Sequence, residues 1–338
     1  MIYGSLCSGI EAATAAWRPL GWRPAFYAEI EKFPSALLAH HYPEIPNHGD
    51  ITAFAQWPDY AINVLVGGTP CQAFSLSGFR KGLDDPRGHL TLTYLAVAAR
   101  YRPNWLVWEN VPGVLSSGGG RDFGALLGGL GQLGYGFAFR VLNAQYFGIP
   151  QQRRRVFVVG YSGNWRPAAA VLFERESFAG CASTRGPARQ NIEPADDAGA
   201  KDDDADPIVS NAEGTTGLPF LTRSNIGKHI NNQSPLVSHC GRVRRLTPRE
   251  CERLQGFRDD YSLVPFSGRP AADGLRYKAL GDSMAVPVME WLGRRIALVE
   301  SIVNKQAAPP DSPLLRDLAP AYTWPSAPPK NYQILTTL

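Results

Sequence analysis

A single thiol follows a stretch that is expected to form a buried strand. Residues 61–66 are a short apolar run rich in β-branched side chains, and two glycines, a threonine and Pro70 separate this run from Cys71. Open α/β sheets bind their ligands at the edge where the parallel strands end. A structural cysteine in the core is the common alternative. A Pro-Cys pair followed by a polar segment rich in Ser and Gly favours a nucleophile at Cys71.

A carboxyl group ends a second apolar run. Residues 104–108 are largely apolar, and Glu109 follows them directly. Burial would raise the pKa of this carboxyl group, which makes Glu109 a candidate proton donor. The alternative is that Glu109 caps a helix in the segment after Pro112. The place of Cys71 at an equivalent strand end favours the chemical role.

Three arginines, residues 153–155, enter a later strand whose apolar run covers residues 156–160. Because alternate strand residues point to opposite faces, Arg153 and Arg155 share one face. A charge cluster is commonly a solvated edge. This pair, however, is placed to reach inward to an anionic or carbonyl partner.

The first 50 residues contain acids placed as in a nucleotide site. Residues 2–8 predict a strand, Gly9 a tight turn, and the residues from Glu11 onward a helix, although the full G-x-G-x-x-G pattern is absent. Glu29 ends the next predicted strand, 20 residues beyond Gly9, where such folds hold ribose hydroxyls. A solvated position at the start of a helix is the alternative for Glu29. Asp50 stands at a third strand–loop junction, and together these features predict an adenosine site.

The composition bounds the class of protein. A chain of 338 residues is long enough for one large and one smaller domain, and a net charge of +4 does not by itself establish a nucleic-acid partner. Five scattered cysteines without a C-x-x-C pair disfavour a zinc site and a disulfide framework, so no metal is expected, and they indicate a reducing compartment. Because no leader-like segment and no apolar run of bilayer length are present, we expect a cytoplasmic protein without a membrane partner.

Six predicted strands alternate with helices up to about residue 162, which indicates an α/β fold with a doubly wound, mostly parallel, Rossmann-like sheet. Beyond this point the alternation stops. The predicted organisation is a larger α/β domain (1–162), a smaller, mostly β or irregular domain (163–275) with an acidic flexible insert near 185–207, a C-terminal helix returning to the first domain (276–304) and a Pro-rich tail (305–338).

A well-defined helix signal begins at Thr247. This residue is expected to cap the helix, Pro248 suits its first position, Glu250 completes a capping box, and Gly256 ends the helix. Arginines surround it and predict a surface that faces phosphates, at Arg242, Arg244, Arg245, Arg249 and Arg253.

These stretches, in this order, resemble the DNA (cytosine-5) methyltransferase family, particularly its compact prokaryotic and phage type. The resemblance covers about residues 1–161 and 242–300, and Pro-Cys-Gln with Glu-Asn-Val downstream is its most specific part. The matching stretches are Leu6-Cys7-Ser8-Gly9-Ile10-Glu11, Glu29, Asp50-Ile51, Gly68-Thr69-Pro70-Cys71-Gln72, Arg87-Gly88-His89-Leu90, Glu109-Asn110-Val111, residues 151–155, residues 245–257 and Gly281-Asp282-Ser283.

The resemblance implies S-adenosylmethionine as methyl donor and a cytosine flipped out of duplex DNA. Cys71 would attack C6 of that base, Glu109 would hold or protonate N3, Arg155 would contact O2, and Arg153 would support the same pocket. The resemblance also implies that residues 1–162 form the catalytic and cofactor-binding domain and residues 163–275 the target-recognition domain. The implied cofactor-binding residues are Ser8, Gly9, Ile10, Glu29, Ile30, Asp50, Ile51, Pro70, Leu90, Asp282 and Ser283. Residues 75–87 would close over the DNA, and the implied DNA contacts are Ser75, Ser77, Arg80, Lys81, Arg87, Arg242, Arg244 and Arg245.

Two departures from the family pattern stand out. Glu11-Ala12 replaces a Gly-Gly pair, as in the phage-type branch, and Asp282 replaces the usual Asn. The alternative functions are a nicotinamide-dependent oxidoreductase on the same fold, a non-catalytic DNA-binding module, and an enzyme that modifies RNA. The partners expected are double-stranded DNA and, functionally, a cognate restriction endonuclease, and we expect a monomer.

Overall fold

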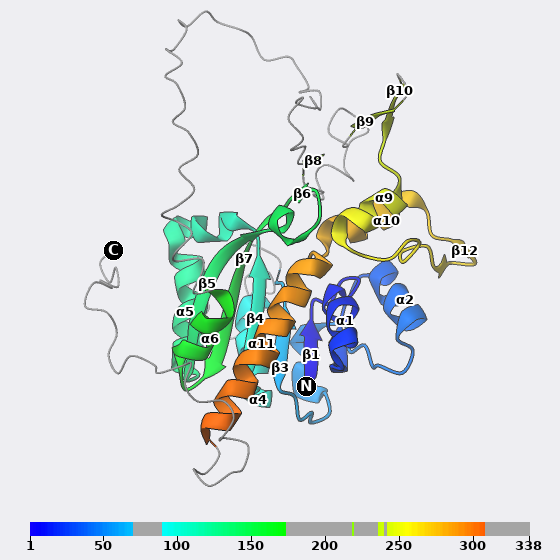
Figure 1. Cartoon of the computed structure of the whole chain (residues 1–338). Coiled ribbons are helices and arrows are strands. Elements are labelled where there is room, and N and C mark those ends of the chain that lie inside the picture. The colour runs from blue at the N-terminus through cyan, green and yellow to red at the C-terminus, as the bar shows by residue number, and fades with distance from the viewer. Residues whose placement is uncertain (70–89, 174–217, 220–235, 240–241, 308–338) are drawn as a thin grey trace, which may run out of the picture.

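The computed structural model describes residues 1–69, 90–173, 218–219, 236–239 and 242–307 (Figure 1). Its centre is a six-stranded sheet in the order β2-β1-β3-β4-β7-β5. The first four strands run parallel, whereas β7 is antiparallel to both β4 and β5. The predicted mostly parallel α/β sheet is confirmed. The strands are β1 Ile2–Leu6, β2 Arg23–Ala28, β3 Val64–Gly67, β4 Trp105–Asn110, β5 Tyr135–Asn143 and β7 Arg154–Ser162.

Helices cover both faces of this sheet because each strand alternates its apolar side chains between two cores. In β4, Trp105 and Val107 face a core shared with α1, α6 and α11, while Leu106 and Trp108 face one shared with α4 and α5. The α-helices are α1 Ala12–Trp17, α2 Lys32–His41, α4 Leu90–Tyr101, α5 Arg121–Gln132, α6 Trp165–Leu172, α9 Pro248–Gln255, α10 Asp273–Asp282 and α11 Val286–Ala307.

The end of the described chain packs against its beginning. The long helix α11 lies across α1 and α6 (Figure 1), and Trp17 of α1 donates its indole N–H to the carbonyl of Met289 at 2.6 Å. The prediction of one C-terminal helix over residues 276–304 needs a correction, because α10 ends at Asp282 and α11 begins at Val286. Pro287 has no backbone N–H to donate, so it fits the first turn of α11.

Two further expectations differ from the structure. Asp50 was expected at a strand–loop junction, but it caps the 3-10 helix η2, and only an isolated bridge between Tyr27 and Asn47 precedes it. Helix α6, assigned by the sequence to the second domain, packs on β5, β7 and α11. The 3-10 helices are η1 Arg18–Leu20, η2 Ile51–Gln56, η3 Pro112–Leu115, η4 Ser117–Gly120 and η5 Ala144–Phe147.

The described parts of the predicted recognition domain contain short two-residue to four-residue strands and α9. The Thr247 hydroxyl and the Glu250 carboxylate form the predicted capping box of α9, and Gly256 ends the helix at φ 81°. The acidic insert near 185–207 and the tail from residue 308 lie outside the described residues. The short strands are β6 Gln151–Gln152, β8 Leu218–Pro219, β9 Leu236–His239, β10 Arg242–Arg245, β11 Pro265–Phe266 and β12 Arg269–Pro270.

None of the helices in the described part of the chain has the length and apolar character needed to cross a bilayer.

Candidate functional site

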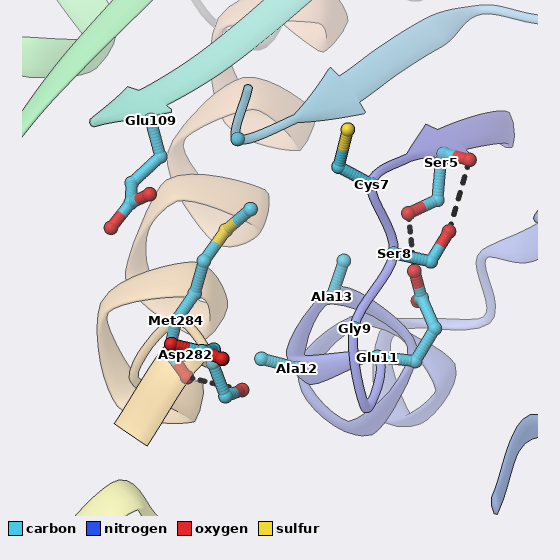
Figure 2. Close-up of a pocket in the computed structure, with 12 residues that line it drawn as sticks. Ser5, Cys7, Ser8, Gly9, Glu11, Ala12, Ala13, Glu109, Asp282 and Met284 are labelled. Atoms are coloured by element: carbon cyan, nitrogen blue, oxygen red, sulfur yellow. Dashed lines mark hydrogen bonds between the residues drawn. The ribbon is translucent and has the colours of Figure 1, made fainter. Parts of the chain in front are cut away.

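A pocket of about 390 Å³, partly open to solvent, lies at the carboxyl edge of the sheet between the β1–α1 turn and the α10–α11 connection (Figure 2). The structure brings together in it five residues that the sequence predicted, namely Ser8, Gly9, Glu109, Asp282 and Ser283. Its other lining residues, which the predicted site did not include, are Ser5, Cys7, Glu11, Ala12, Ala13, Gly68 and Met284.

Glu109, at the end of β4, is held by a guanidinium group. Its Oε1 lies 3.0 Å from Nε of Arg155, and each side chain is 13% exposed. In the sheet Glu109 pairs with Phe157, so Arg155, two residues away on β7, is its diagonal neighbour on the same face. The alternative role as a helix cap is excluded, because η3 begins after Val111 and has no side-chain cap.

Gly68 lets the backbone after β3 approach this carboxylate. A Cβ at Gly68 would lie 3.0 Å from Oε2 of Glu109 and 3.6 Å from Cε of Met284. A side chain at this position would therefore crowd the Glu109 carboxylate, whereas its contact with Met284 would be ordinary.

Arg153 is buried, and its guanidinium group donates hydrogen bonds to backbone carbonyls. Its Nη2 donates to the carbonyls of Gly281, at 3.0 Å, and Ser283, at 2.6 Å. Burial, reinforced by the positive charge of Arg155, lowers the pKa of Arg153 to about 9, so the group remains protonated at neutral pH. Arg153 thereby holds the α10–α11 connection against the sheet.

The β1–α1 turn is shaped by positive φ angles and by Glu29. Cys7, Gly9 and Glu11 have φ of 50°, 55° and 60°. Glu29, at the end of β2, accepts the N–H of Gly9 on Oε2 and the N–H of Glu31 on Oε1, both at 2.7 Å. Burial raises the pKa of the Glu29 carboxyl group. Each carboxylate oxygen keeps a second lone pair for a ligand hydroxyl.

The remaining predicted cofactor residues divide by exposure. The side chain of Ile10 lies in the core, and its carbonyl accepts the hydroxyl of Tyr261 at 2.8 Å. Ile51 is buried beside the capping Asp50, and Leu90 packs at the start of α4. Ile30 is 69% exposed, an apolar side chain available to a ligand ring.

Asp282, which departs from the family pattern, ends α10 at the rim of the pocket (Figure 2). One of its oxygens lies 3.9 Å from the amine of Lys278, and the same amine binds Glu31, two residues beyond Glu29. Lys278 thus joins the two rims, α10 and the start of α2.

A cluster that the sequence analysis missed holds the described chain two residues before Cys71. The Thr69 hydroxyl lies 2.7 Å from that of Thr91 and accepts the indole N–H of Trp108 at 3.0 Å. The Thr69 carbonyl accepts the amide of Asn110 at 2.9 Å. The two described ends of the segment around Cys71 are therefore fixed to each other and to β4. Asn110, which directly follows Glu109, was the signal in the sequence that could have indicated this cluster.

Several predicted residues lie outside the described part of the chain, namely Pro70, Cys71, Ser75, Ser77, Arg80, Lys81 and Arg87. The side chain of Arg242 is likewise not described, whereas those of Arg244 and Arg245 are exposed.

The arginines around α9 have carboxylate partners. Arg244 forms two hydrogen bonds to Glu250, at 2.8 and 2.7 Å. Arg249 binds Asp260 and Arg253 binds Asp259 in the same manner. These groups are exposed, so phosphates have access to them but must compete with the carboxylates.

A glycine turn beside a strand-end acid, with a paired carboxylate at a neighbouring strand end, defines a Rossmann-like nucleotide-binding fold with a polar catalytic edge. The crystal structure of S. pombe Dnmt2 methyltransferase has the same fold, with a TM-score of 0.62 and 19% identity over 90% of this chain and 99% of that one. A putative DNA modification methyltransferase encoded within an E. coli prophage also has this fold. Its TM-score is 0.58, with 16% identity over 89% of this chain and 99% of that one.

The family model for C-5 cytosine-specific DNA methylase matches residues 1–179 and 208–298. The chain belongs to this family, and the predicted enzyme class, a DNA (cytosine-5) methyltransferase, is confirmed.

Curated relatives are similar along most of this chain. The type II methyltransferase M.NgoBI of Neisseria gonorrhoeae is 30% identical over 84% of this chain and 89% of its own length. A protein of Escherichia phage P1 named DNA N-6-adenine-methyltransferase is 35% identical over 88% of this chain. The chain spans 61% of that phage protein.

Proposed function

We propose that the chain transfers a methyl group from S-adenosylmethionine to C5 of a cytosine flipped out of duplex DNA, through a covalent bond between Cys71 and C6. The observation that carries the proposal is the joint placement of two groups at one pocket. The paired Glu109 carboxylate forms one wall, and the β1–α1 turn, whose Gly9 N–H binds Glu29, forms the opposite side.

Covalent geometry supports the role of Cys71. Thr69 is fixed to Trp108 and Asn110 beside Glu109, and consecutive Cα atoms are about 3.8 Å apart, so the Cα of Cys71 lies within about 7.6 Å of that of Thr69. A thiol on this short tether can reach a base that Glu109 holds.

The chain's own residues supply the polar chemistry on the base. Addition of the Cys71 thiolate to C6 makes C5 nucleophilic, and a proton held at N3 by Glu109 prevents negative charge from accumulating on the ring. Arg155 orients Glu109 and offers its remaining N–H groups to O2. Once C5 has taken the methyl group, a base removes the C5 proton, and the C6–S bond breaks to restore the aromatic ring and the thiolate.

The pocket fits the proposed cofactor. S-adenosylmethionine, when bound, supplies a methyl group on a cationic sulfonium. Glu29 is placed to hold the ribose hydroxyls, Ile30 to contact the adenine, and Asp282 and Ser283 to contact the amino-acid end. A Cβ at Gly9 would meet nothing within 4 Å, so the turn leaves open space where the cofactor would lie.

We further infer that residues 163–275, most of which lie outside the described part of the chain, select the DNA sequence. Replacing the segment between Arg166 and Arg242 by that of a relative should move the methylated site. An unchanged site would contradict this inference. A cognate restriction endonuclease remains a proposal too, since relatives are named both type II and orphan methyltransferases.

The reaction is tested by incubating the protein with labelled S-adenosylmethionine and either mixed-sequence duplex DNA or transfer RNA, and then analysing the nucleosides. We expect 5-methylcytosine. Label in N6-methyladenine, as the name of the phage P1 relative would suggest, or label in transfer RNA but not in DNA, would refute the proposed substrate.

A further inference from the structure

Glu11 combines two unfavourable features in the wall of the pocket (Figure 2). It is the N-cap of α1 with φ 60° and ψ 58°, a left-handed conformation that is unfavourable for a residue with a Cβ. Its carboxyl group is also buried, with the residue only 1% exposed. Such a residue persists when its surroundings hold it firmly.

The surroundings of Glu11 are hydrogen-bond donors from both sides of the turn. The Ser5 hydroxyl, from β1, donates to Oε1. Thr14, from α1, donates its backbone N–H at 3.0 Å and its hydroxyl at 2.5 Å to Oε2. The carboxylate thus ties the end of the strand to the start of the helix, across the turn.

The donors extend into a second layer. The Thr14 hydroxyl gives its one proton to Glu11, so the hydroxyls of Tyr3, at 2.6 Å, and Tyr27, at 2.9 Å, must donate to Thr14. Every proton of this network points toward Glu11, which is the arrangement around an ionised carboxylate. Burial raises the pKa of Glu11, and the bonds from Ser5 and Thr14 oppose that shift.

The network reaches Glu29 by two routes. The turn that Glu11 braces presents the N–H of Gly9 to Oε2 of Glu29 at 2.7 Å. Tyr27, at the other end of the network, is two residues before Glu29 on β2. The orientation of the Glu29 carboxylate therefore depends on the geometry that Glu11 maintains.

We propose that Glu11 is a positioning residue for the nucleotide cofactor. Its carboxylate fixes the β1–α1 turn in a strained form, and this form aligns the Gly9 N–H and the Glu29 carboxylate for the ribose. The proposal rests on S-adenosylmethionine being the ligand of this pocket. It assigns a function to the residue at which the chain departs from the glycine pattern of its family.

Calorimetric binding of S-adenosylmethionine to the wild type, Glu11→Gln and Glu11→Gly tests the proposal. In Glu11→Gln, the side-chain NH₂ group would face the donors of Ser5 and Thr14. In Glu11→Gly, the carboxylate is removed and the backbone strain is relieved. We expect both variants to bind at least about 10-fold more weakly, as loss of one buried hydrogen-bond acceptor implies. DNA affinity, and kcat at saturating cofactor, should stay within about 2-fold, so that KM for the cofactor carries the effect. Glu44→Gln, at an exposed position, is the matched control.

The outcomes separate this inference from the proposed function. A wild type that does not bind S-adenosylmethionine refutes the cofactor. If the wild type binds S-adenosylmethionine and Glu11→Gly binds it with equal affinity, the positioning role is refuted. The carboxylate would then only offset the local backbone strain of Glu11 and would not affect cofactor binding. If the Glu11 variants do not fold, Ser5→Ala decides: it removes one donor from Glu11, and an unchanged cofactor affinity in this variant also overturns the proposal.

Discussion

Single side chains take different roles at the edge of the sheet. Glu109 lies near the end of β4, Arg153 directly precedes β7, and Arg155 lies in β7. The sequence predicted that Arg153 and Arg155 share a face and reach an anionic or a carbonyl partner. The structure gives one of each, since Arg155 binds the Glu109 carboxylate and Arg153 binds two backbone carbonyls. Strand alternation made the shared face predictable, but which partner each residue takes depends on β4 and on the α10–α11 connection, which are distant in sequence.

Arg155→Lys should separate the pairing of Glu109 from charge alone. Lysine keeps the charge but lacks the guanidinium Nε that lies 3.0 Å from Glu109. We expect kcat for methyl transfer to fall about 100-fold, which is typical for a disturbed acid–base group, with little change in cofactor affinity. The exposed Arg154→Lys is the control and should keep full activity. An active Arg155→Lys enzyme would show that the pair is not needed.

Cys7, the thiol that lines the pocket, should be chemically inert. Burial, with a contribution from the Glu29 carboxylate, raises the pKa of Cys7 to about 12. The thiolate is the reactive form, so alkylation of Cys7 by iodoacetamide at pH 8 should be undetectable in the folded protein and complete in denaturant. Peptide mass spectrometry provides the measurement. Rapid labelling of Cys7 in the folded state would contradict the structure.

At the scale of elements, helix caps and turns were predicted more completely than the hydrogen bonds between elements that are distant in sequence. The capping box of α9 is local, so Thr247, Glu250 and the final glycine could be identified from spacing. The bonds of Thr69 to Thr91, Trp108 and Asn110 join three elements and leave no local pattern. Asp50 was misplaced for a related reason, because a single bridge to β2 replaces the expected strand.

Thr247→Ala should lower the free energy of unfolding by about 1 kcal/mol, the usual cost of an N-cap hydroxyl. Urea unfolding measures this, and Thr52→Ala, at an exposed position, is the control. No loss of stability would mean that the cap is redundant.

The partner of Thr247 adds a pH dependence. Arg244 is the main group that lowers the pKa of Glu250, from 4.5 to about 2. Because the pKa in the folded state is lower, the pair stabilises the fold above pH 4.5, and this contribution is lost as the pH falls toward 2. Arg244 is exposed and Glu250 is only half-buried, so solvent screens the pair and we expect a small contribution. The difference in unfolding free energy between wild type and Glu250→Gln should shrink over this range, and a constant difference would contradict the assignment.

Thr91→Val should disturb the site from outside it. The substitution preserves the side-chain shape but removes the hydroxyl that meets Thr69, two residues before Cys71. We expect kcat/KM for DNA to fall about 10-fold, because a buried Thr69 hydroxyl loses a partner, while cofactor affinity stays unchanged. A parallel loss of cofactor binding would instead indicate a general loss of folding.

At the scale of the whole molecule, α11 connects the last described residues with the first. It packs on α1, the helix that follows the turn with Gly9 and Glu11, and it shares a core with α6 (Figure 1). The order of strands and helices, and the family, could be predicted because they depend on periodicity and on a few motifs. The packing of α6 and α11 on one face could not, since it depends on which apolar surfaces meet.

The central claim is that Cys71 is the nucleophile of a methyl transfer to cytosine at this pocket. Its most direct test compares transfer of labelled methyl groups from S-adenosylmethionine to duplex DNA by the wild type, Cys71→Ala and Cys7→Ala. We predict label at cytosine C5 with the wild type, none with Cys71→Ala although that variant still binds the cofactor, and a clear signal with Cys7→Ala. Undiminished transfer by Cys71→Ala would contradict the account.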